Sequence, residues 1–186
     1  LPLVLICFFM IKAKAQNANI DKEAFAHTFS VVAKDPRTGE MAVAVQSHWF
    51  SVGSLVSWGK SGVGVVATQS FVNPAYGPNG LKLMGGGMST KDALDELVSQ
   101  DEGRDYRQIA FLDVKGNVAA YTGKLCVESA AHIEGENFSV QANMMLNDKV
   151  VPAMAEAFKA NVDLPLAERM VEVLKAAQNA GGDIRG

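Results

Sequence analysis

Cysteine and histidine are scarce in this chain of 186 residues, and their scarcity argues against most metal-dependent chemistry. The sequence has two cysteines and three histidines, with no HExxH motif and no closely spaced cysteine pair. Zinc sites use such ligands in characteristic spacings. The glycine run from Gly85 to Gly87 lacks the Lys-Ser/Thr of a phosphate-binding loop, and we expect it to end a helix. The sequence therefore predicts no metal and no cofactor.

Positive charge is also in short supply. Lys and Arg number 17 against 20 Asp and Glu, which gives a formal net charge of −3. Without a basic cluster, the chain is a poor candidate for binding nucleic acid or an anionic membrane. No apolar run reaches the roughly 20 residues that span a bilayer, so we do not expect a transmembrane protein.

A shorter apolar run opens the chain, from Leu1 to Ile11, and is followed by Ala13-Lys14-Ala15, the small-x-small pattern of a signal-peptidase site. This pattern predicts a signal peptide over residues 1–15 and export to the periplasm or exterior of a bacterial cell. An uncleaved anchor or a buried strand is the alternative. Cleavage would remove two lysines, leaving 15 Lys and Arg against 20 Asp and Glu, a net charge of −5. It would also leave Cys126 as the single cysteine, which excludes an internal disulfide.

Residues 16–27 are polar and aperiodic, and predict a linker or pro-segment. Strand patterns begin at Thr28: FSVVA and MAVAV flank the turn DPRTGE, and VGSLVSWG and GVGVVATQS follow as two further runs. RQIAFLDV and VAAYT predict a second hairpin around Lys-Gly-Asn, and FSVQANMM predicts another strand.

Helices are predicted at two places along the chain. YGPNGLKLMGGG contains a short one, and Ser89 to Asp92 resembles a capping box before the next. Asn147 is expected to cap a third helix, and Asp163 and Pro165 to start a last one that Gly181-Gly182 ends. The predicted order along the chain is strands, two helices, strands and two helices. This order predicts one α+β domain over residues 28–186, a four-layer αββα sandwich of antiparallel sheets.

Conventional catalytic triads are difficult to assemble from these residues. Ser47 and His48 are strand neighbours whose side chains point to opposite faces, and no GxSxG motif is present. Cys126 and His132 are close enough in sequence for a dyad across a loop. A lone cysteine is more often a small buried hydrophobe, and nothing local would lower the pKa of this thiol.

Thr28 offers a different nucleophile. A threonine hydroxyl needs an adjacent base. If Thr28 were the first residue, its own α-amine, with a pKa of about 7.7–8.0, could accept the proton near neutral pH. The alternative is a β-branched residue that simply favours a strand.

Several long blocks resemble one bacterial family: HTFSVVAKDPRTGEMAVAVQSHWFSVG, GVGVVATQSFVNPAYGPNGL, RQIAFLD, HIEGENFSVQANMM and AERMVEVLKAAQNAGGDIRG. The family is an uncharacterised one, a domain of unknown function, in the N-terminal nucleophile (Ntn) hydrolase-like superfamily. The resemblance implies an αββα sandwich and hydrolysis of amide bonds by an N-terminal Thr, Ser or Cys. Relatives begin Met-Thr-Phe-Ser, and their threonine matches Thr28.

This chain differs from those relatives at both ends. Signal-peptidase cleavage would leave Gln16 first, so a free Thr28 amine requires a second cut after His27, for which an autocatalytic reaction is our hypothesis. At the other end, relatives continue beyond GDIRG into a further apolar strand. We therefore expect one strand of the domain to lie beyond Gly186.

The remaining site predictions concern polar residues near strand ends. Asn143 is our candidate oxyanion donor, with Asn73 as second choice, although either could be a turn former. Gln69 and His48 are expected to line the substrate cleft. Asp183 and Arg185 in GGDIRG are further substrate-binding candidates. They are also expected to pair with each other or with Arg107, and such a structural role is at least as good an explanation as substrate binding.

Three functions stay open. The first is an exported Ntn-type hydrolase acting on a small amide or peptide, for example one derived from the cell wall. The second is a non-catalytic binding or surface-assembly protein on the same fold. The third is a Cys126-dependent hydrolase. In each case a homodimer through edge strands is a plausible assembly.

Overall fold

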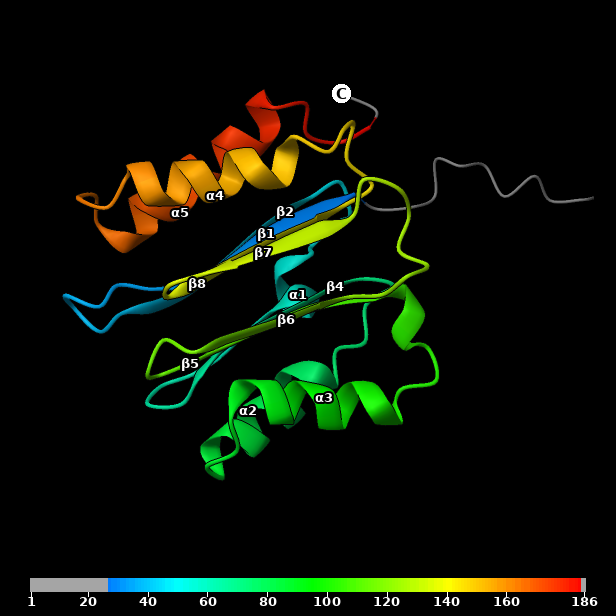
Figure 1. Cartoon of the computed structure of the whole chain (residues 1–186), viewed down its shortest axis with the longest axis vertical. Helices are drawn as coiled ribbons and strands as arrows, with labels where there is room; N and C mark the ends of the chain where they lie inside the picture. The colour runs from blue at the N-terminus through cyan, green and yellow to red at the C-terminus, as the bar shows by residue number, and fades with distance from the viewer. Residues whose placement is uncertain (1–26, 185–186) are drawn as a thin grey trace, which may run out of the picture.

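The computed structural model describes residues 27–184, which form four layers. Two β-sheets stack face to face, with helices α4 and α5 covering one outer face and α2 and α3 covering the other (Figure 1). The predicted α+β architecture of two stacked antiparallel sheets with helices outside is confirmed. The predicted signal peptide and most of the predicted linker lie outside the described residues.

The first sheet has the strand order β2-β1-β8-β7, and every pairing is antiparallel. Its strands are β1 (Thr28–Lys34), β2 (Met41–Ser47), β7 (Ala131–Gly135) and β8 (Phe138–Asn143). The tight turn between β1 and β2 is closed by Asp35, which accepts hydrogen bonds from the backbone and side chain of Arg37. Gly39 ends that turn at φ +78°, a conformation that favours glycine.

The second sheet has the order β3-β4-β5-β6, again antiparallel. Its strands are β3 (Ser57–Lys60), β4 (Gly64–Ser70), β5 (Arg107–Asp113) and β6 (Val118–Thr122). The predicted Lys-Gly-Asn turn joins β5 to β6, and Asp113 accepts hydrogen bonds from its backbone at Lys115 and Asn117. A short 3-10 turn, η2 (Arg104–Tyr106), leads into β5.

The helices are α1 (Gly53–Val56), α2 (Tyr76–Gly85), α3 (Thr90–Gln100), α4 (Val150–Ala160) and α5 (Leu166–Asn179). Ser89 caps α3 as predicted, because its hydroxyl accepts a hydrogen bond from the Asp92 N–H at 3.1 Å. The prediction that Asn147 caps α4 was wrong: Lys149 holds the cap position, and Asn147 accepts a hydrogen bond from the Lys149 N–H in the preceding turn.

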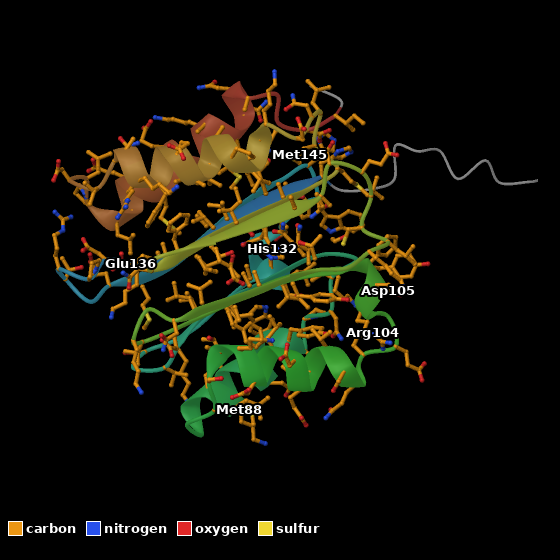
Figure 2. The ribbon with its side chains drawn as sticks, viewed as in Figure 1. Met88, Arg104, Asp105, His132, Glu136 and Met145 are labelled. Carbon is orange, nitrogen blue, oxygen red and sulfur yellow. The ribbon has the colours of Figure 1, made fainter. Side chains whose placement is uncertain are left out.

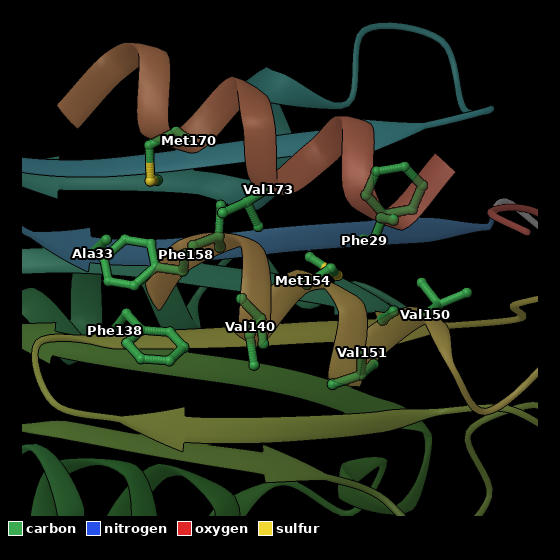
Figure 3. Close-up of a cluster of buried hydrophobic side chains, with 14 of the residues drawn as sticks. Phe29, Ala33, Phe138, Val140, Val150, Val151, Met154, Phe158, Met170 and Val173 are labelled. Carbon is green, nitrogen blue, oxygen red and sulfur yellow. The ribbon is translucent and has the colours of Figure 1, made fainter. Parts of the chain in front are cut away.

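Three apolar clusters hold the layers together. The cluster in Figure 3 joins α4 and α5 to the first sheet, and its Phe138 and Phe158 rings lie 4.3 Å apart between centroids. The Arg169 guanidinium lies 3.5 Å from the Phe158 centroid, a cation–π contact. A second cluster joins α2 and α3 to the other sheet, and a third fills part of the space between the sheets.

Two further local predictions were wrong. VGSLVSWG is not one strand, because its first half forms α1 and only Ser57–Lys60 pairs with β4. The segment around His132 is not a loop but strand β7, and His132 lies between the two sheets (Figure 2).

Candidate functional site

Polar side chains fill one end of the space between the sheets. Along β1, Val32 belongs to the apolar cluster between the sheets. Ser30 and Thr28, two and four residues before it, therefore face the same side of the sheet. The same alternation turns polar residues of β4, β5 and β8 inward, and all are at most 1% exposed. They are Gln69, Gln108, Ser139, Gln141 and Asn143.

Gln108 organises this network. Its Nε2 donates to the carbonyl oxygens of Ala131 and Ala142, at 3.1 and 3.0 Å, so its amide orientation is defined by backbone. The Oε1 atom then accepts from Gln69 Nε2 at 2.7 Å and from Asn143 Nδ2 at 3.1 Å. Both neighbouring amides are therefore oriented as donors toward Gln108. Their own oxygens, Gln69 Oε1 and Asn143 Oδ1, are buried without a hydrogen-bond partner.

Thr28 begins β1 opposite Ser47 on β2 and Asn143 on β8. Its Oγ1 lies 2.9 Å from Ser47 Oγ. The Ser47 hydroxyl donates its single proton to the His27 carbonyl oxygen at 2.8 Å. Toward Thr28, Ser47 Oγ can therefore act only as an acceptor, so the Thr28 hydroxyl is the donor.

The peptide bond before Thr28 is held from several sides. The His27 carbonyl oxygen accepts the Ser47 hydroxyl and, at 3.3 Å, the His48 N–H. The His27 ring is buried, with Nδ1 2.7 Å from the Met144 carbonyl oxygen and 2.9 Å from Asp183 Oδ1. Two donors thus polarise the carbonyl that adjoins the Thr28 hydroxyl.

A cavity of about 360 Å³ opens at this end of the sandwich. Its polar floor comes from Thr28, Gln69 and Ser70, and most of its wall is apolar. The remaining lining residues are Trp49, Val52, Leu55, Val56, Phe71, Val72, Arg107 and Met144. Ser70 and Met144 have φ values of +68° and +58°. Such left-handed conformations in residues other than glycine are energetically costly and are common at functional sites.

Arg107 is the charged residue of this lining. Its Nε donates to Asp101 Oδ2 at 2.9 Å, and its Nη1 donates to the Phe71 carbonyl oxygen. Burial opposes ionisation of Asp101, but hydrogen bonds from Arg107, the Gly103 N–H and Tyr76 outweigh it and lower the pKa of the carboxyl. Arg107 therefore pairs with Asp101, rather than with Asp183 as one of our predictions had it.

Some of the predicted site residues lie at the cavity, and others have contacts elsewhere. Gln69 lines the cavity, whereas the His48 side chain is exposed and does not. Asn73 acts as the alternative turn former, because its Oδ1 accepts from the Ala75 N–H at 3.1 Å before α2. Asn143 lies opposite Thr28, and its Nδ2 uses one of its two N–H donors on Gln108 Oε1, so its role as oxyanion donor stays a prediction. Asp183 pairs with His27.

One predicted residue is not described by the structure, and several residues of the cavity were not predicted. Arg185 lies outside the described residues. Sequence reasoning overlooked Trp49, Leu55 and Met144. The signal for the first two was present, since WFSVGSLV is an apolar run that begins where β2 ends.

Cys126 and His132 line a separate surface hollow with Thr122 and Glu128. The Cys126 thiol donates to the Arg107 carbonyl oxygen at 3.3 Å, and His132 Nδ1 lies 2.8 Å from Thr122 Oγ1. Burial raises the pKa of the Cys126 thiol and lowers the pKa of His132. Both shifts disfavour a thiolate–imidazolium pair.

Within residues 27–184, no three His, Cys, Asp or Glu side chains are grouped so as to hold a metal ion. No helix of that part is long and apolar enough to cross a membrane.

Fold and site together define a protein of two stacked antiparallel sheets covered by helices, with a polar floor and an apolar cavity at one end. The chain belongs to the family of unknown function DUF1028, whose model matches residues 28–186. It is similar to the protein SPO2555 from Silicibacter pomeroyi, known from a crystal structure of the same family, with 35% sequence identity and a TM-score of 0.81. That match covers 84% of this chain and 69% of the other. None of the curated proteins matches.

Proposed function

We propose that this protein is an exported amidohydrolase of the N-terminal nucleophile type, which cleaves an amide bond of a small amide or peptide. Thr28 is the nucleophile and its own α-amine is the base. One observation carries the proposal: Thr28 lines the cavity, and its hydroxyl adjoins a carbonyl that two donors polarise. The export step of the proposal rests on the Leu1 to Ala15 pattern.

Freeing the Thr28 amine requires cleavage of the His27–Thr28 bond. In the proposed cut, Thr28 Oγ1 attacks the His27 carbonyl carbon while its proton passes to Ser47 Oγ, and the Ser47 proton passes to the His27 oxygen. Collapse breaks the C–N bond, with a proton transferred to the leaving nitrogen, and gives an ester. Water then hydrolyses the ester to a His27 carboxylate and a Thr28 with free hydroxyl and amine. The match to the family begins at Thr28, which is consistent with this new terminus.

The surroundings suit a free amine at this position. The His48 N–H bonds to His27, so the antiparallel alternation directs the Thr28 nitrogen toward β8, where Asn143 is its partner. Asn143 Oδ1 is a buried acceptor without a partner, and an amine would supply a donor. Near its usual pKa of about 7.7–8.0, that amine accepts the hydroxyl proton during attack on the substrate.

Intact-mass measurement combined with turnover of an acyl-amide panel tests the proposal. The wild-type chain is expected to begin at Thr28 and to hydrolyse at least one amide, and Thr28→Ala is expected to stay uncut and inactive. Thr38→Ala, in the exposed β1–β2 turn, is the matched control and keeps both properties. Ser47→Ala is expected to slow the cut about a hundredfold, whereas the exposed Ser99→Ala does not. An active wild-type chain that still begins at Gln16 contradicts the proposal, as does equal turnover by Thr28→Ala.

A further inference from the structure

The chemistry of the cavity wall indicates which amides can enter it. Beside Thr28, the walls consist largely of apolar side chains from three segments. Val52, Leu55 and Val56 come from the β2–β3 connection, Phe71 and Val72 follow β4, and Met144 follows β8. Trp49 and Phe71 at the mouth remain 53% and 43% exposed, although both are large aromatics. Such exposed apolar surface around a cavity is typical of a binding site.

The charged side chain of the cavity lining, Arg107, has its hydrogen-bond and ion-pair partners before any ligand binds. Arg107 is committed to Asp101 and to the Phe71 carbonyl oxygen. Among the described residues that line the cavity there is no carboxylate and no lysine. A charged group that entered would leave water without gaining a counter-ion, which is costly.

Two buried polar atoms of the residues that line the cavity, Gln69 Oε1 and Ser70 Oγ, have no hydrogen-bond partner, and the first points to a ligand. Gln69 is 1% exposed and lines the cavity, and Gln108 holds its amide nitrogen, so Oε1 is oriented as a free acceptor. A buried acceptor of this kind is stabilised by a ligand that brings an N–H or O–H donor. The N–H of a substrate amide is such a donor.

We propose that the cavity selects amides that carry an uncharged, apolar side chain, with an amide N–H of the ligand donating to Gln69 Oε1. The volume of about 360 Å³ equals that of roughly ten to fifteen water molecules, which fits a blocked leucine or phenylalanine residue. The choice of an amide rests on the proposed function, whereas the side-chain preference rests on the wall alone.

Binding to the full-length Thr28→Ala chain tests this preference without turnover. The ligands are N-acetyl-leucinamide, N-acetyl-aspartamide with a free side-chain carboxylate, and N-acetyl-lysinamide, titrated by NMR. The leucyl amide is expected to bind at least about tenfold more tightly than the two charged amides. Equal or tighter binding of a charged amide overturns the proposal, and so does the absence of leucyl binding.

A charge introduced into the wall provides a test that misfolding cannot imitate. Leu55→Arg, in the Thr28→Ala background, is expected to reverse the preference and bind the aspartyl amide most tightly. Val162→Arg is the matched control, because Val162 is half-exposed in the α4–α5 connection, at the opposite end of the sandwich from the start of β1 (Figure 1). A Leu55→Arg variant that still prefers the leucyl amide overturns the assignment of this wall.

The outcomes for the two proposals are separable. Selective binding by Thr28→Ala with no wild-type turnover of any amide refutes the nucleophile and supports the cavity assignment. Efficient wild-type hydrolysis of aspartyl or lysyl amides, with leucyl amides ignored, refutes the cavity assignment and leaves Thr28 in place.

Discussion

Replacing Gln108 by leucine is expected to destabilise the protein more than any other single polar substitution between the sheets. The change removes the acceptor for the Gln69 and Asn143 amides, and it removes the donor to the Ala131 and Ala142 carbonyl oxygens. Each buried polar group that loses its partner costs about 1–3 kcal/mol. Leucine retains much of the packing, so we expect the free energy of unfolding to fall by about 3–5 kcal/mol. That is a large part of the roughly 5–15 kcal/mol that holds a typical domain together.

Urea denaturation with linear extrapolation measures the loss, and an unchanged m-value would indicate that the native state stays compact. Gln46→Leu is the matched control: Gln46 is exposed on edge strand β2, so its replacement should change stability by about 0.5 kcal/mol or less. A loss below about 1 kcal/mol for Gln108→Leu refutes the reasoning, because the buried amides would then not depend on their mutual hydrogen bonds.

Two further predictions concern titratable groups. Burial lowers the pKa of His132 below its ordinary 6.5, so the unfolded chain takes up a proton first as the pH falls. The stabilisation that neutral His132 gives is present above pH 6.5 and is lost as the pH falls through the pKa of the folded state. Urea titrations at several pH values should show this loss of unfolding free energy in the wild type and not in His132→Gln. Burial raises the pKa of the Cys126 thiol, so Cys126 should react slowly with a disulfide reagent at pH 7 in the folded state and rapidly in urea. Cys126→Ala should retain full turnover, and inactivity of that variant in a folded chain would instead favour the cysteine-dependent alternative.

The layer order of this fold could be predicted because its strands carry strong local signals. Val-rich runs, turn residues such as those in DPRTGE and the Ser89 cap act over a few neighbouring residues. Strand pairing could not be predicted, since β1 pairs with β8 more than a hundred residues away. The short β7 was missed because AHIEG has only one strongly apolar residue in its middle.

The site, too, could be predicted only where its residues carry local signals. Thr28 and Asn143 were singled out from strand ends, and they do lie opposite each other. The orientation of the Asn143 amide depends on Gln108, which looks like an ordinary polar residue near the start of a strand. The apolar wall depends on where the segments after β2 and β8 turn, and the left-handed conformation of Met144 has no sequence signature.

The two ends of the space between the sheets differ in how much structural displacement their contacts tolerate. At one end, contacts such as those of Val32 with the opposite sheet are non-directional, so small shifts and altered loops can be absorbed there. At the other end, Gln108 hydrogen-bonds across to the first sheet, and such bonds tolerate little displacement. We therefore expect changes of length in the distal turns to cost little stability, whereas changes that shift Thr28 relative to the opposite sheet should cost more.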